Sequence, residues 1–171
     1  MKAALFSLVG LLAGHPAAAQ GLPAGRALPP ADEAAIRWVV QRLNANHNDH
    51  HFGDLATYAT ADLSLVNVAG EWLRVRRRVQ AAFQTAFDRF PAGTTFAFGA
   101  PVIRAVAPGA AIVNQTYWMG ARHPPDGGPR GGTQNLITLV LVKQQGRWLL
   151  TAGQGTAVAA TPALDHSAPA N

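Results

Sequence analysis

The chain has 171 residues, of which 49% are hydrophobic and 13% charged, and it contains no cysteine. This length suits one globular domain, and the lack of cysteine excludes disulfides, thiolate catalysis and zinc–cysteine sites. The formal net charge of +5 includes the stretch RVRRR at residues 74–78. We interpret this stretch as the exposed turns of an amphipathic helix and expect no nucleic-acid partner, because no aromatic residues alternate with the arginines.

The start of the chain has the pattern of a secretory signal peptide. Lys2 precedes an apolar run, and Ala17 and Ala19 form an A-x-A cleavage site. We therefore predict a bacterial protein that is periplasmic or secreted, with no membrane attachment after cleavage. The chain is predicted to divide into a signal peptide, a Pro/Gly linker, one domain and a disordered tail, at residues 1–19, 20–30, 31–157 and 158–171.

Three helices are predicted in the first half of the domain. The first begins at Pro30, and a short second helix follows Asp54 as its N-cap. The third runs from about Val75 to Phe90 on a stripe of apolar residues. One face of the first helix carries residues spaced by four, three and four positions, namely Ile36, Val40, Leu43 and His47.

Strands are predicted for most of the remainder. Residues 63–68, LSLVNV, alternate so that Leu63, Leu65 and Asn67 share one face. Four longer strands follow, joined by short turns at Pro108-Gly109 and Gln145-Gly146 and by a Gly/Pro-rich loop, at residues 94–104, 110–119, 134–143 and 147–156.

This order of elements predicts an α+β fold in which three N-terminal helices pack against one face of a curved, mainly antiparallel sheet. A sheet curved in this way leaves a pocket between its open end and the helices. The stretch LITLVLV is apolar on both faces of its strand. Because a strand buried on both sides needs a second cover, we expect a homodimer through the sheet.

Three stretches resemble a known group of proteins. They are ADLSLVNVAGEWLR from Ala61, RRRVQAAFQTAF from Arg76 and GGTQNLITLVLVKQQGRWLLTAGQGT from Gly131. The chain resembles the nuclear transport factor 2-like superfamily of conical folds, and within it the SnoaL-like SgcJ/EcaC family. The resemblance covers about residues 33–156. It implies a small-molecule pocket inside the cone and either a SnoaL- or ketosteroid-isomerase-like enzyme or an oxidoreductase, the activity by which the SgcJ/EcaC family is known.

The chain departs from the family pattern at several positions. The family usually ends its first helix in Trp-Asn-x-His-Asp, where this chain has His47 in place of Trp and His51 in place of Asp. Phe83 stands where the family often has an inward histidine, and Gly155 replaces an asparagine. These differences imply a pocket that is less basic than is usual in the family.

The residues expected to face the pocket are polar and neutral, and no acid lies in the four long strands. Glu71, beside a turn, is the one acid within a predicted strand. We therefore predict an exported small-molecule-binding domain that needs no cofactor, with two alternatives: an enzyme using His47 as its catalytic acid or base, and a structural dimerisation domain. The candidate ligand-binding residues are Tyr58, Asn67, Trp72, Asn114, Tyr117 and Gln154. Gln154 is included because it lies an even number of positions from Trp148 and Leu150, so a regular strand would point all three side chains to the same face.

Residues 46–51, NHNDHH, raise the question of a metal site. His47 and His51 could converge only if the helix continued through this polar stretch, which favours helix poorly. We therefore predict that His47 belongs to the pocket or core and that His50 and His51 belong to a turn, with no metal. A zinc site made by the three histidines stays as the alternative, to be tested by metal analysis.

Overall fold

The computed structural model describes residues 27–91, 93–120 and 133–158. The predicted signal peptide, most of the linker, the Gly/Pro-rich loop and nearly all of the tail lie outside these residues. No helix in the described part of the chain is long and apolar enough to cross a bilayer. The elements, in chain order, are α1 (Pro30–Asn48), the 3-10 turn η1 (Leu55–Thr57), β1 (Ala59–Val66), β2 (Trp72–Arg74), α2 (Arg76–Phe87), β3 (Phe96–Phe98), β4 (Val102–Ala107), β5 (Ala110–Met119), β6 (Thr133–Gln144) and β7 (Arg147–Ala157).

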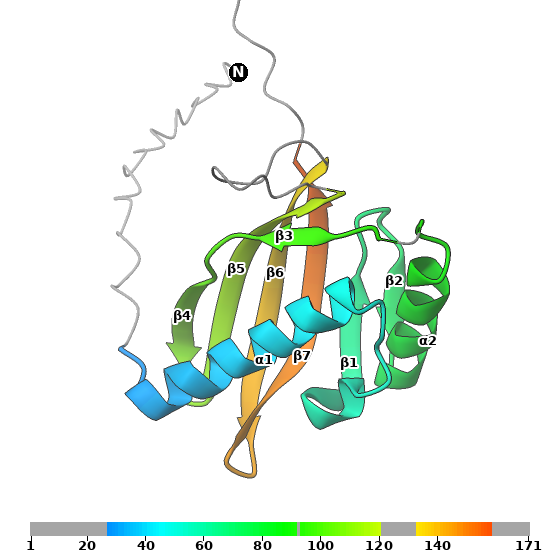
Figure 1. Ribbon diagram of the computed structural model, residues 1–171. Coiled ribbons are helices and arrows are strands. Elements are labelled where there is room, and N and C mark those ends of the chain that lie inside the picture. The colour runs from blue at the N-terminus through cyan, green and yellow to red at the C-terminus, as the bar shows by residue number, and fades with distance from the viewer. Residues whose placement is uncertain (1–26, 92, 121–132, 159–171) are drawn as a thin grey trace, which may run out of the picture.

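The strands form one curved sheet in the order β2-β1-β7-β6-β5-β3, with β4 also paired to β5. Helix α1 crosses the concave face of this sheet, and α2 lies at the edge formed by β1 and β2 (Figure 1). The sheet is mixed, because β1 pairs with β7 in parallel while the other pairs are antiparallel.

The core lies between α1 and the concave face of the sheet. Ile36 and Val40 of α1 are at most 1% exposed, as are Leu139 of β6 and Leu150 of β7. Each such side chain stabilises the folded state by about 1.5–3 kcal/mol because it is removed from water. The predicted start of the first helix at Pro30 and its predicted buried face are confirmed.

The prediction of three helices is wrong, since the described residues form two. Asp54 does not cap a second helix: its side chain instead reaches back to Arg42 and Asn46 of α1. Only the three-residue turn η1 separates Asp54 from Tyr58, and β1 begins at the next residue.

The single strand predicted at residues 94–104 is two strands, β3 and β4. Both pair with β5, and the chain leaves the sheet between them at Gly99-Ala100-Pro101. Proline has no N–H to donate to a strand partner, and the Gly99 N–H still bonds the Thr116 carbonyl at 2.9 Å. The break bends the end of the sheet over the end of α1, where Asn48 bonds Phe96 of β3.

A β-bulge in β7 decides which residues face the core. Val140 pairs with Ala152 but Leu141 pairs with Leu150, so Thr151 is an extra residue in β7. One extra residue reverses the alternation of side chains beyond it. Leu150 therefore faces the concave side, while Gln154 pairs with Thr138 on the convex side.

Candidate ligand-binding cavity

A cavity of about 220 Å³ lies between α2, the β1–β2 turn and the end of the sheet formed by β3, β5 and β6. Four polar residues line it, and they come from α1, the β1–β2 turn and β5: His47, Asn67, Glu71 and Tyr117. The apolar lining comes mainly from α2 and the strands, namely Leu65, Leu73, Ala82, Phe83, Ala86, Phe87, Phe90, Phe96, Met119 and Ile137.

His47 lies in the last turn of α1 inside a cluster of aromatic rings. Six ring centroids lie between 5.2 Å (Phe87) and 6.4 Å (Tyr117) from its own, mostly in edge-to-face geometry. The imidazole therefore packs as one ring among aromatic rings. His47 is buried and lines the cavity.

The hydrogen bonding of His47 determines what it presents to the cavity. Its Nδ1 lies 2.8 Å from the Leu43 carbonyl, which can only accept, so Nδ1 carries the proton. Burial lowers the pKa of His47 to about 4, more than the Leu43 contact raises it. At neutral pH the ring is therefore uncharged, and Nε2 is an acceptor with no hydrogen bond to any described residue.

Tyr117 of β5 supplies a second polar group without a partner. Its ring packs 5.9 Å from Phe98, centroid to centroid, and its hydroxyl makes no hydrogen bond to a described residue. Burial raises the pKa of Tyr117, so the phenol stays protonated. The hydroxyl can donate to or accept from a molecule in the cavity.

Asn67 and Glu71 form the rim of the cavity at the β1–β2 turn. The Asn67 Oδ1 accepts from the N–H groups of Ala69 and Glu71, both at 3.0 Å, and its Nδ2 donates to Glu71 Oε2 at 3.0 Å. Asn67 thus organises the turn and positions Glu71. Sequence reasoning recognised Glu71 as an acid beside a turn but did not place it at the pocket, because the closure of the turn brings it there.

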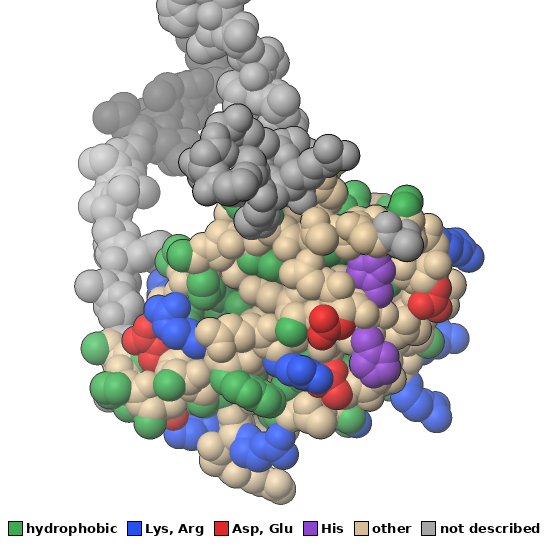
Figure 2. Space-filling model, viewed as in Figure 1, with side chains coloured by type: hydrophobic (Ala, Val, Ile, Leu, Met, Phe, Trp, Pro, Cys, Tyr) green, Lys and Arg blue, Asp and Glu red, His purple; other side chains and the backbone are tan. Residues whose placement is uncertain are grey.

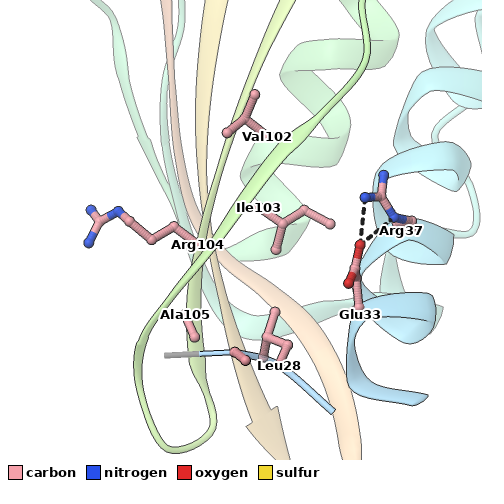
Figure 3. A pocket seen from close by; sticks show the side chains of 8 residues that line it. Leu28, Glu33, Arg37, Val102, Ile103, Arg104 and Ala105 are labelled. Carbon is pink, nitrogen blue, oxygen red and sulfur yellow. Dashed lines mark hydrogen bonds and ion pairs between the residues drawn. The ribbon is translucent and has the colours of Figure 1, made fainter. Parts of the chain in front are cut away.

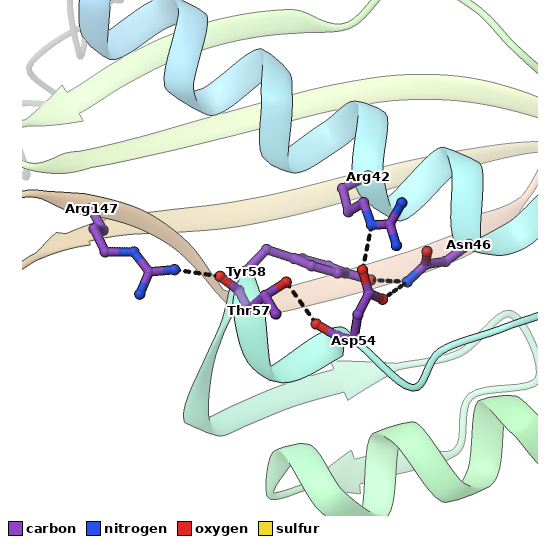
Figure 4. A network of polar contacts seen from close by, with 6 residues as sticks. All are labelled: Arg42, Asn46, Asp54, Thr57, Tyr58 and Arg147. Carbon is purple, nitrogen blue, oxygen red and sulfur yellow. Dashed lines mark hydrogen bonds and ion pairs between the residues drawn. The ribbon is translucent and has the colours of Figure 1, made fainter.

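Tyr58 lies in the core and not in the cavity. It is fully buried, and its hydroxyl accepts a hydrogen bond from Asn46 Nδ2 at 2.9 Å. Asn46 also donates to Asp54, which pairs with Arg42, so the four side chains join α1 to the η1 segment (Figure 4). Burial raises the pKa of Tyr58 well above its ordinary value. Its environment is that of a structural hydrogen bond.

The other three candidates lie on the convex face of the sheet. Trp72 is 61% exposed and donates to Ser64 at 2.7 Å, and Asn114 donates to Thr138 at 2.8 Å. Trp72 pairs with Val66 of β1. Val66 faces the opposite side of the sheet from its neighbour Leu65, which is buried. The placement of Gln154 on the concave face is wrong because the bulge at Thr151 reverses the alternation.

The NHNDHH stretch clamps the end of α1 to β3. Asn48 donates to the Phe96 carbonyl at 3.1 Å and accepts from its N–H at 2.7 Å, while His50 Nε2 donates to the Thr94 carbonyl at 2.9 Å. His47 lies inside the aromatic cluster, and His50 packs at its side, with ring centroids 5.5 Å from Phe87 and 6.3 Å from Phe96. Within the described ranges, no group of three or more His, Cys, Asp or Glu side chains is arranged to hold a metal ion.

A second cavity, of about 480 Å³, lies between the start of α1 and β4. Ile103 points toward α1 across it, whereas Arg104 points away (Figure 3). On the helix side, Arg37 donates to Glu33 at 2.6 Å, so these two charges neutralise each other. Over the face of the molecule that carries α1, acidic and basic side chains are interspersed (Figure 2).

Comparison with known proteins supports the fold. No family model matches the chain, and neither does any curated protein sequence. Similar solved structures include an uncharacterized protein with a cystatin-like fold from Caulobacter vibrioides, 25% identical over 74% of this chain and 89% of that chain, with a TM-score of 0.65. A nuclear transport factor 2-like protein of unknown function from Pseudomonas putida is 13% identical over 80% of this chain and 93% of that chain, with a TM-score of 0.65.

A third similar structure is a candidate scytalone dehydratase from Novosphingobium aromaticivorans. It is 16% identical over 77% of this chain and 87% of that chain, with a TM-score of 0.61. The chain therefore has the nuclear transport factor 2-like, or cystatin-like, fold. At these identities the likenesses show the fold alone.

Proposed function

We propose that this domain binds a small, largely apolar aromatic molecule in the cavity beneath α2 and does not transform it. One observation supports this most directly: an aromatic-lined cavity presents His47 Nε2 and the Tyr117 hydroxyl, and neither group has a hydrogen-bond partner in the described chain. Ligand sites are typically apolar with a few placed polar groups. We also propose membership of the SgcJ/EcaC-type group, on the motifs quoted above.

The volume sets the size of the ligand. A cavity of about 150 Å³ holds benzene, whereas drug-sized ligands occupy about 300–1,000 Å³. At about 220 Å³, this cavity suits one aromatic ring with a short substituent. The expected ligand is smaller than a steroid or a multi-ring polyketide.

The competing hypothesis is an enzyme in which His47 transfers protons, as in the SnoaL- or ketosteroid-isomerase-like activity or the oxidoreductase activity that the resemblance implies. General acid–base catalysis works best when the pKa of the group lies near the working pH. A pKa of about 4 makes His47 a weak base at neutral pH and leaves it no proton to donate from Nε2. If the protein converted carbon acids such as ketosteroids and the His47→Phe variant did not, this hypothesis would replace ours.

Filling the cavity is expected to weaken binding strongly. Ala82 of α2 lines the cavity, and its neighbour Ala81 is exposed on the same helix. With 2-phenylethanol as the probe in isothermal titration calorimetry, Ala82→Phe should weaken binding by more than about tenfold, because the new ring occupies the site. Ala81→Phe adds the same ring outside the cavity and should leave the affinity unchanged. Equal affinities for the two variants would contradict the proposed site.

We further propose that two copies associate through the convex face of the sheet. The central strand β6 presents Leu136, 37% exposed, and the half-buried Val140 on this face. No described helix covers them, since α1 lies on the concave face and α2 at the edge (Figure 1). Light scattering during size-exclusion chromatography should give twice the mass of one chain, and Val140→Glu should halve it. A monomer for the unaltered protein would contradict the proposal.

Export to the periplasm or the medium is part of the same proposal, on the N-terminal pattern of the sequence. The expected result is recovery of the protein from the periplasmic fraction or the medium, with an N-terminus at Gln20 by mass spectrometry. Recovery of the uncleaved chain from the cytoplasm would contradict it.

A further inference from the structure

The charge of the cavity lining has one sign. Of the residues that line it, Glu71 alone carries a charge at neutral pH, and none is lysine or arginine. The rings of Phe83, Phe87, Phe90 and Phe96 line the same space, and the face of an aromatic ring carries partial negative charge. An anion would therefore be repelled by the carboxylate, whereas a cation would be attracted by the carboxylate and by an aromatic face that it approaches.

Glu71 is held in place but is not neutralised. Asn67 donates to its Oε2, and the Glu71 N–H is bonded to the same side chain. No described residue donates to Oε1, and no basic side chain in the described chain forms an ion pair with Glu71. One carboxylate oxygen at the rim is thus free to accept from a ligand.

The nearest arginines in the sequence are engaged elsewhere. The Arg74 guanidinium lies 4.7 Å above the Trp72 ring, on the convex face of the sheet. Arg76 donates to the Ala59 carbonyl at 2.8 Å. Neither supplies the counter-charge that the cavity lacks, in a chain whose net charge is +5.

On the basis of the proposed function, we propose that the ligand is a small aromatic amine. Its ring fills the cavity among Phe83, Phe87 and Tyr117, and its ammonium group binds Glu71 at the rim. A cation within about 6 Å of an aromatic face is attracted by the ring. A carboxylate at the rim adds an ion pair that is partly open to water. Both effects select an amine over a neutral or acidic molecule of the same size.

Three probes that differ in one terminal group test the inference: 2-phenylethylamine, 2-phenylethanol and phenylacetate. By calorimetry at low salt we expect the amine to bind about tenfold tighter than the alcohol, and phenylacetate to bind weakest. The preference for the amine should shrink as salt is added. In Glu71→Gln, which loses the charge but keeps an oxygen that can accept from Asn67 Nδ2, the amine and the alcohol should bind within about threefold.

Glu33→Gln is the matched control, because Glu33 lines the other cavity and pairs with Arg37. It should retain the full preference for the amine. Equal binding of the three probes, or a preference that persists in Glu71→Gln, would overturn the amine inference and leave the binding function intact. If none of the three bound, both proposals would fail.

Discussion

Replacing Asn46 with alanine is expected to lower the free energy of unfolding by about 3 kcal/mol, a large share of the stability of a small domain. Asn46 is 1% exposed and donates to both Asp54 and Tyr58. Its removal leaves the fully buried Tyr58 hydroxyl and an oxygen of the partly buried Asp54 carboxylate without their donor. Each unsatisfied buried group costs about 1–3 kcal/mol. Urea unfolding at pH 7.5 measures the loss as a lower midpoint at constant slope.

Arg42→Ala is the matched control in the same network. The Arg42 side chain is 41% exposed and also binds Asp54. Because exposed ion pairs contribute little to stability, this variant should lose much less free energy of unfolding than Asn46→Ala. Equal losses for the two variants would mean that the buried amide has no special role.

His47 is expected to make the protein lose stability in mild acid. Its pKa falls from an ordinary 6.5 to about 4 on burial, so the unfolded chain binds a proton before the folded one does. The stability associated with His47 is therefore complete above about pH 6.5 and declines as the pH falls toward about 4. At 1.36 kcal/mol per pKa unit, the loss is about 3 kcal/mol. Unfolding curves measured across this range give its size.

The His47→Phe variant isolates this effect from the titration of acids elsewhere. A phenyl ring suits the surrounding edge-to-face contacts, so the variant should stay within about 1.5 kcal/mol of the original at pH 7.5. Its stability should decline less steeply between pH 6.5 and 4. Identical slopes for the two proteins would show that His47 is protonated as readily in the folded state as in the unfolded one.

Local sequence patterns predicted much of the fold. The helical spacing from Ile36 to His47 fixed which face of α1 is buried, and the Pro108-Gly109 turn fixed the start of β5. The missed features depend on tertiary contacts. Asp54 has the chemistry of a helix cap but is bound by Asn46 and Arg42, and the parallel pairing of β1 with β7 has no local signal.

Three of the seven candidate residues line the cavity. His47 and Tyr117 lie on regular elements, and Asn67 lies at the β1–β2 turn. Gln154 lies beyond one extra residue in β7, which sequence alternation cannot detect and which reverses every later position. Glu71 reaches the rim through a turn organised by Asn67, so its place depends on three hydrogen bonds and not on its spacing.

The most direct test of the cavity is methyl NMR of the isoleucines, which report from four different places. Ile137 lines the cavity, Ile103 the cleft beside β4 and Ile36 the core, while Ile112 shares the convex face with Asn114. On titration with 2-phenylethanol, we expect the δ1-methyl signal of Ile137 to shift saturably and the other three to stay in place. Shifts at Ile103 or Ile112 with an unmoved Ile137 would contradict binding in this cavity.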